Sequence, residues 1–305
     1  MSGFFASDPV RTALVAGGLT AVVSGVVGVF VVLRGQSFAG HALGDMGTLG
    51  GSAAYLANVS PLWGYVGVGA VVAAAMELFG VQRRRERDVA TGIVLGATLG
   101  LSALLLYLDS TSSSTTGVAA SVLFGSLFAF APSALPETTA LAAAALVVVA
   151  AVFRPLLLSS IHPELASVRD VPVRGVATVF IVVMGVTVSL ASTVVGTVLS
   201  PALLVGPSAA ALRLSRRPGA AMALAAVLGI AATWLGVTLA YASHDWPPAH
   251  QGWPISFFVV AIVFVIYAVT ESVGPRAAGR GRPDATVEAQ TPLAGTPTAG
   301  TAQVR

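Results

Sequence analysis

The side chains best suited to hold an ion in this sequence lie in one short stretch, residues 37–52. Read as a helix, the stretch carries a polar stripe at helical spacing, formed by His41, Asp45, Thr48 and Ser52. An imidazole and a carboxylate one turn apart can reach the same metal ion. Ionisable residues are costly in an apolar helix and tend to mark a path for ions or substrates. The stripe therefore predicts a cation site at His41 and Asp45, with Thr48 and Ser52 lining the pore beyond it.

Two ligands from one chain are too few to hold a transition-metal ion selectively, because such ions take four or more ligands. A homodimer would present the stripe twice around a twofold axis, giving two imidazoles and two carboxylates. This set suits zinc-type or manganese-type ions, and its two negative charges offset part of the cost of burying a divalent cation. The spacing of His41 and Asp45 fits equally well a hydrogen-bonded packing pair or the lining of a cavity.

The composition indicates a membrane protein. Of the 305 residues, 55% are hydrophobic and only 10% are charged, and the mean hydropathy is +0.86. Soluble domains carry about a quarter charged residues. Apolar runs of the length that crosses a bilayer recur to about residue 270. We therefore expect an all-α polytopic membrane protein with eight or nine transmembrane helices, made of a permease-like membrane domain at 1–274 and a disordered tail at 275–305.

The missing residue types exclude several classes of protein. The chain has no cysteine, so it has neither disulfides nor a thiolate metal site. All 16 basic residues are arginine. A Walker A loop requires a lysine, so this chain is not a P-loop ATPase. It also lacks the His-Glu-x-x-His and Gly-x-Ser-x-Gly motifs of membrane hydrolases. We therefore expect a protein that is not an enzyme and holds no permanent cofactor.

Most of the expected spans follow directly from the apolar runs. Residues 118–131 are apolar but too short to cross alone, which favours a re-entrant helix. Pro201 and Pro207 are expected to break the short helix that ends at Arg213, while Pro163 starts a short helix outside the bilayer. The full-length spans are expected near 10–33, 36–58, 61–80, 89–108, 135–153, 176–198, 220–242 and 255–269.

The arginines predict the orientation. They cluster at 83–87, 154–174 and 213–217 and after 275, whereas the polar loops at 109–116 and 244–254 have none. The positive-inside rule then places the arginine loops and the C-terminus in the cytoplasm and the N-terminus outside. We interpret these clusters as topology signals, and not as nucleic-acid binding. Three residues of an outer loop could bind metal or a partner, although a solvated loop explains them as well: His244, Asp245 and His250.

Four stretches in this order resemble the permease subunits of ABC importers for zinc, manganese and iron(II). They read VLRGQSFAGHAL at 32–43, ATGIV at 90–94, LFGSL at 123–127 and VGTVLSPALLVGPSAA at 195–210. In that family the first stretch usually reads Gly-Asp-Ala-Leu-Ser-His, and its Asp and His line the dimer axis as metal ligands. Here the two ligand types are exchanged, as His41 and Asp45. The resemblance keeps a divalent-cation site and leaves the particular metal open.

A fifth stretch resembles the cytoplasmic Asp-Pro-Glu-x-Ala segment with which these permeases contact their ATPase. The matching residues are His162, Pro163, Glu164, Leu165 and Ala166. The resemblance therefore implies a homodimeric permease in the lipid of the plasma membrane that transports a divalent metal ion. It also implies two partners, a cytoplasmic ABC ATPase subunit and an extracytoplasmic metal-binding protein.

Two other transport functions remain open at this stage. In a secondary transporter driven by an ion gradient, Asp45 would be a proton or sodium site. An ABC permease for an iron chelate such as a siderophore, or for a corrin, would need a wider axis without ligands. The sequence does not identify the metal, the crossing count or the partner subunits.

Overall fold

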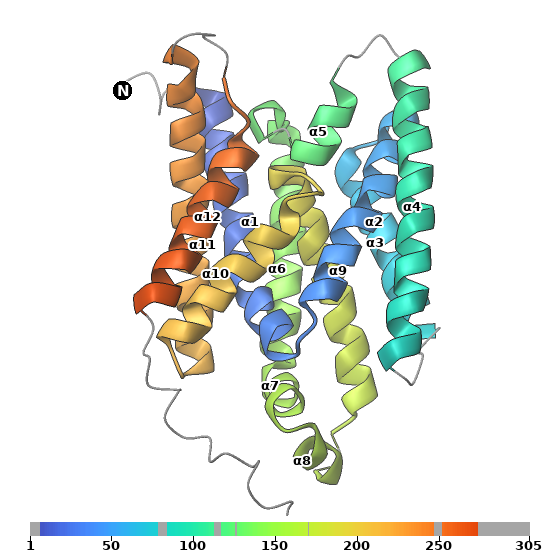
Figure 1. Ribbon diagram of the computed structural model, residues 1–305, viewed down its shortest axis with the longest axis vertical. Coiled ribbons are helices and arrows are strands. Elements are labelled where there is room, and N and C mark those ends of the chain that lie inside the picture. The colour runs from blue at the N-terminus through green and yellow to red at the C-terminus, as the bar shows by residue number, and fades with distance from the viewer. Residues whose placement is uncertain are drawn as a thin grey trace, which may run out of the picture.

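The computed structural model describes residues 7–78, 84–112, 117–125, 127–169, 171–246 and 252–273. Within these residues all regular secondary structure is helical, as the composition predicts. The long helices run mostly along the long axis of an elongated bundle (Figure 1). The expected tail at 275–305 and His250 lie outside the described residues, so the boundary between domain and tail stays a prediction.

The helices follow the expected order. The first part of the chain forms α1 (Asp8–Leu33), α2 (Ser37–Leu56), α3 (Pro61–Leu78), α4 (Arg84–Ser112) and the short α5 (Val118–Phe124). The middle part forms η1 (Leu127–Ala129), η2 (Pro132–Ala134), α6 (Leu135–Ala151), α7 (Phe153–Ile161) and α8 (Pro163–Val168). The last part forms α9 (Val173–Val195), α10 (Ser200–Leu214), α11 (Pro218–Ala242), η3 (Ser243–Asp245) and α12 (Ile255–Val273).

The helices differ in whether they can cross a bilayer on their own. Among the described residues, five segments are long and apolar enough: Asp8–Leu33, Pro132–Ala151, Val173–Val195, Pro218–Ala242 and Ile255–Ser272. Shorter apolar segments lie at Pro61–Val71 and Leu95–Thr111. The glycine-rich α2 and the 15-residue α10 add two further helices to the bundle. The expected eight or nine crossings are therefore approximately consistent with a mixture of full-length spans and shorter helices.

Two helix ends meet inside the bundle. Gly125 ends α5 and Gly196 ends α9, and both adopt positive φ angles, +77° and +90°. A Cβ atom on Gly196 would overlap the backbone of α5, so only glycine allows this approach. Across the contact, the amides of Thr197 and Val198 donate to the carbonyls of Val122 (3.2 Å) and Leu123 (3.4 Å). Within the predicted segment 118–131, residues 118–124 form the short α5, whose end is bonded to the α9–α10 break, and its being re-entrant stays a prediction.

One expectation about α10 is wrong. The helix is continuous through Pro207 instead of breaking there. Pro201 lies in the first turn, where the missing N–H has no partner to lose. At Pro207 a single backbone bond is lost, the one that an N–H would have donated to the carbonyl of Leu203. The neighbouring Ser208 hydroxyl lies 3.3 Å from the carbonyl of Gly25 in α1 and so links the two helices at this point. Tight packing of α10 against α1 and α11 then holds the helix together.

The second helix, α2, packs into the core. α2 packs against α3 and α4 on one side and against α9 and α10 on the other. Its apolar residues Leu43 and Met46 join a buried cluster with Phe30 of α1 and with Phe180 and Met184 of α9. Small residues allow the backbones to approach closely, as is usual between membrane helices. The fold therefore buries most of α2 and leaves one side of it, which includes Phe38, exposed.

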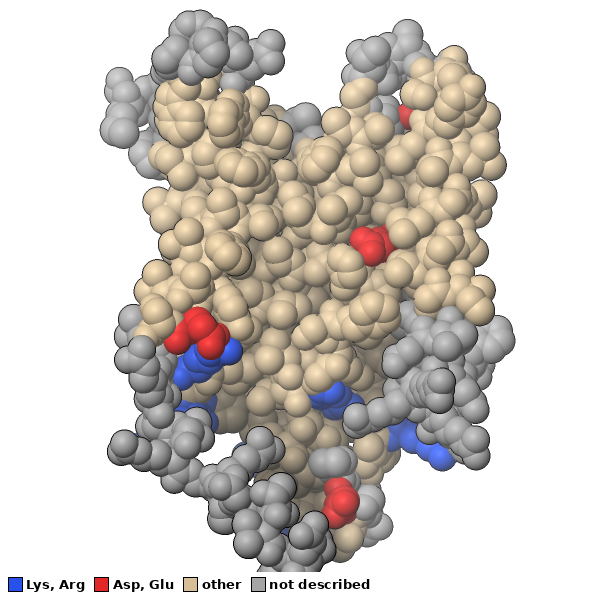
Figure 2. Space-filling view, viewed as in Figure 1, with Lys and Arg blue, Asp and Glu red and all other residues tan. Residues whose placement is uncertain are grey.

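Most of the described arginines lie toward one end of the molecule, and Arg11 at the start of α1 is an exception. In the view of Figure 2 they gather in the lower part, the end from which α7 and α8 project in Figure 1. The residues at the helix ends there include Arg34, Arg154, Arg169 and Arg213. This one-sided distribution agrees with the arginine pattern of the sequence, and the assignment of this end to the cytoplasm stays a prediction.

Candidate metal-binding site

The two candidate ligands contact each other on the surface of α2. His41 Nε2 lies 3.3 Å from Asp45 Oδ2, across one helical turn. The imidazole is 49% exposed and the carboxylate only 14% exposed. Figure 2 shows acidic surface over α2 halfway along this face, and Asp45 is the only acidic residue of that helix. The predicted pairing of His41 with Asp45 is therefore present, with one edge open.

The other half of the polar stripe has a different environment. Thr48 is 3% exposed and Ser52 is fully buried. Thr48 Oγ1 donates to the carbonyl of Asp45 at 2.6 Å and lies 3.3 Å from Thr197 Oγ1, while Ser52 Oγ donates to the carbonyl of Thr48 at 2.5 Å. Thr197 in the α9–α10 break contacts the Thr48 hydroxyl, and both hydroxyls are buried within a single chain. Their assignment as pore-lining residues stays a prediction.

Thr197 connects α2 to α5 and α10. Its Oγ1 donates to the carbonyl of Val122 in α5 at 3.2 Å, and its own carbonyl accepts from Ser200 Oγ in α10 at 3.1 Å. Thr48 therefore reaches, through one residue, the end of α5 and the start of α10. The sequence pattern singled out Thr48 but not Thr197, because the partner is 149 residues away.

The described residues of one chain do not complete a metal site. Among them, no group of three or more His, Cys, Asp or Glu side chains could hold a metal ion. His41 and Asp45 supply an imidazole and a carboxylate, fewer ligands than a transition-metal ion takes. His244 is exposed in η3. The Glu137 carboxylate of α6 accepts a hydrogen bond from the Trp63 indole at 3.0 Å.

The predicted ATPase contact forms a helix of its own. α8 starts at Pro163, as expected, and the amide of Ala166 donates to the carbonyl of His162 at 3.1 Å. His162, Glu164 and Leu165 are exposed, whereas Ala166 is buried. The helix projects from the lower end of the bundle (Figure 1). Its surface is suited to a partner, and its role in coupling stays a prediction.

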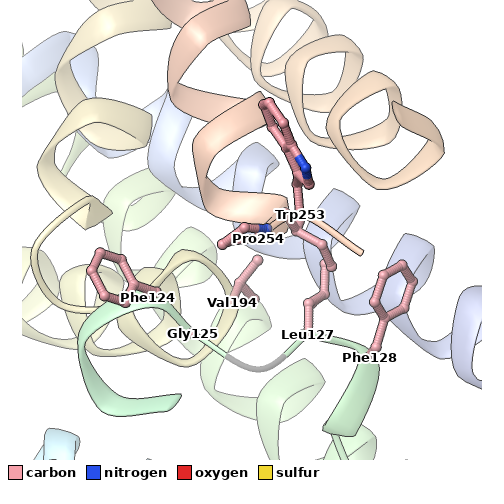
Figure 3. A pocket seen from close by; sticks show the side chains of 8 residues that line it. Phe124, Gly125, Leu127, Phe128, Val194, Trp253 and Pro254 are labelled. Atoms are coloured by element: carbon pink, nitrogen blue, oxygen red, sulfur yellow. The ribbon is translucent and has the colours of Figure 1, made fainter. Parts of the chain in front are cut away.

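A separate cavity lies beside the α5–α9 contact (Figure 3). Its volume is about 220 Å³. None of the described residues that line it carries a titratable side chain. The lining residues are Phe124, Gly125, Leu127, Phe128, Val194, Trp253, Pro254 and Ile255.

Comparison with known proteins places the chain in a family. The sequence pattern of the ABC 3 transport family matches residues 7–270. The manganese transport system membrane protein MntC of Halalkalibacterium halodurans is 30% identical over 228 residues, which cover 74% of this chain and 77% of that protein. The manganese import system permease protein ScaB of Streptococcus parasanguinis is 27% identical over 231 residues, covering 76% of this chain and 81% of its own length.

A solved structure supports the same fold. PsaBC from Streptococcus pneumoniae, solved in complex with Fab, superposes with a TM-score of 0.78 at 23% identity and covers 91% of this chain and 96% of that one. The resemblance to metal-ion ABC permeases is thereby confirmed. The chain belongs to the ABC 3 transport family, as a multi-pass membrane transport subunit that is not an enzyme and depends on a separate ATPase subunit.

Proposed function

We propose that this chain is the permease subunit of an ATP-driven importer of a divalent transition-metal ion, with manganese as the first candidate. The His41–Asp45 pair on α2 carries the proposal, because it brings an imidazole and a carboxylate together on a partly exposed face of an otherwise apolar bundle. The named activities of the relatives MntC and ScaB, which are manganese transport and import, support the choice of metal. Zinc and iron(II) fit the same ligand types.

The translocation path is formed by two copies of the chain. Around a twofold axis, the α2 helices contribute His41 and Asp45 twice, so two imidazoles and two carboxylates surround one ion. The two carboxylates neutralise a divalent charge, which lowers the cost of holding it inside the membrane. Nitrogen and oxygen ligands without thiolates suit an ion that must also be released.

The partners follow from the same assignment. A cytoplasmic ABC ATPase contacts the exposed side chains of α8, and an extracytoplasmic metal-binding protein delivers the ion at the opposite end. The chain crosses the plasma membrane several times and has its C-terminus in the cytoplasm. ATP-driven movement of α8 opens the inner side of the path while the ion is held at His41 and Asp45.

Uptake of Mn²⁺ by proteoliposomes that contain the permease with its ATPase subunit tests this function. We expect uptake to require ATP and to fall to background in Asp45→Ala, with one bound ion per two chains lost in elemental analysis. Asp8→Ala, at the exposed start of α1, is the matched control and leaves both unchanged.

Two outcomes would replace the proposal. Uptake driven by a proton gradient without ATP would indicate a secondary transporter with Asp45 as an ion site. Uptake of a metal chelate, unaffected by Asp45→Ala, would indicate a permease for larger substrates whose axis has no ligands.

A further inference from the structure

An arginine at the inner end of the bundle contacts three helices. Arg34 caps the end of α1, and its Nη1 lies 3.2 Å from Ser159 Oγ and 3.4 Å from Ser160 Oγ, both in α7. The guanidinium carbon lies 5.3 Å from the centre of the Phe180 ring in α9. One side chain thereby ties together α1, α7 and α9.

The hydrogen bonds around Arg34 are well defined. The hydroxyls of Ser159 and Ser160 both donate to the carbonyl of Leu156, at 3.1 and 2.5 Å. Their protons are therefore already used, and their oxygens are free to accept from the guanidinium. Both hydroxyls accept from the same nitrogen, Nη1, while the guanidinium group lies over the Phe180 ring. A lysine ammonium could donate to the hydroxyls but has no flat guanidinium to stack on the ring, so it would replace only part of these contacts.

The surroundings of Arg34 are rigid. Phe30 packs edge to face on Phe153 of α7, with ring centres 6.0 Å apart, and on Phe180 at 6.2 Å. Phe30 and Phe180 are almost completely buried. Closely packed aromatic rings do not deform gradually, so a shift of α7 must also move the ends of α1 and α9.

The position of Arg34 along the chain joins two functional elements. Three residues after it α2 begins, and His41 follows about one helical turn further on. On the other side of the contact, α7 ends at Ile161 and α8 begins at Pro163. The guanidinium thus belongs to a residue just before α2, which carries the candidate ligands, and it bonds to the end of α7, which leads into α8.

We propose that Arg34 is a positioning residue that transmits movement of α7 and α8 to α2. The inference rests on the proposed function, in which α8 receives the ATPase and α2 holds the ion. Arg34 is not among the residues proposed to hold the ion or to contact the ATPase. It makes the two movements depend on each other, which is the physical content of coupling between distant sites.

The test compares Arg34→Gln with Arg11→Gln in the complex with the ATPase subunit in proteoliposomes. Arg11 lies at the opposite, exposed end of the same α1 helix. We expect Arg34→Gln to bind Mn²⁺ and hydrolyse ATP while the Mn²⁺ taken up per ATP falls about tenfold, a change typical of lost coupling between sites. Arg34→Lys should lose a smaller part of this ratio, and Arg11→Gln none.

A purely structural role would lower the amount of folded complex and would not change the ratio of uptake to hydrolysis. An unchanged ratio in folded Arg34→Gln would therefore overturn the inference. If that variant does not fold, Ser159→Ala with Ser160→Ala applies the same test, because it removes the acceptors and keeps the Arg34–Phe180 stacking. Uptake that survives Asp45→Ala would instead refute the proposed function, whatever Arg34 does.

Discussion

The two halves of α2 carry polar residues at the same spacing in opposite environments. In the half that begins at Ser37, which we call the inner half, His41 and Asp45 contact each other and their side chains remain partly exposed. In the outer half, Thr48 and Ser52 are buried, and their hydroxyls bond within the chain. The fold therefore completes one half of the stripe by itself and leaves the other incomplete. We infer that the inner half is completed by an ion and a second copy of the chain.

The largest expected effect comes from exchanging the two candidate ligands. The single variants His41→Asp and Asp45→His should each reduce Mn²⁺ uptake by about 100-fold or more, since even outer-shell partners of a metal contribute 10–100-fold to affinity or activity. His41→Asp would place four carboxylates around the axis, and Asp45→His four imidazoles without compensating charge. The double exchange restores two of each type, in the order usual for the resembling permeases. We expect it to recover uptake to within about tenfold of the original chain.

Elemental analysis of the purified chain should follow the same pattern, with metal retained only in the original chain and in the double exchange. If the double variant binds no more metal than the single ones, the twofold ligand set is wrong. A site within one chain, with ligands outside the described residues, would then become the better explanation.

The sequence predicted the polar stripe on α2 but not that its two halves differ in burial. Helical spacing was sufficient to bring His41 and Asp45 together, because both lie on one helix. The burial of Thr48 depends on Thr197, which a long-range contact brings next to it. Likewise, Pro207 predicts a break in α10, but the packing of α10 against α1 and α11 keeps the helix continuous, and a sequence pattern does not show that packing. Local patterns specify local elements, whereas their covering by other helices depends on the whole fold.

Crosslinking can show whether the inner halves of two α2 helices face each other. The chain contains no cysteine, so a single introduced cysteine reports one position. Phe38 is 54% exposed and lies one turn before His41. We expect most of the Phe38→Cys variant to run as a covalent dimer on a denaturing gel after mild oxidation in membranes. The Ser52→Cys variant, whose cysteine would be buried, should stay monomeric. Equal crosslinking at both positions would contradict the difference between the halves.

A stability measurement can test how firmly the outer half is held. A Cβ atom on Gly64 of α3 would overlap the carbonyl of Gly50 in α2, whereas one on Gly67 would meet open space. We expect Gly64→Ala to lower the free energy of unfolding in detergent by about 2–3 kcal/mol, as overpacking of a close contact does. Gly67→Ala, on the same helix, should change it by less than about 0.5 kcal/mol. Equal losses would indicate that α3 responds to helix propensity and not to contact with α2.

The smallest expected effect concerns the hydroxyl at the junction of the two halves. Thr48→Val keeps the shape of the side chain and removes its bonds to Asp45 and Thr197. Hydrogen bonds between membrane helices contribute about 0.6 kcal/mol on average, so we expect a loss of roughly 0.5–1 kcal/mol. Thr178→Val is the control, since the Thr178 hydroxyl donates to a carbonyl of its own helix. Metal content should be unchanged, because a buried hydroxyl that already bonds inside the protein is no ligand. If Thr48→Val removed the metal, the outer half would belong to the site, and the division of α2 would have to be abandoned.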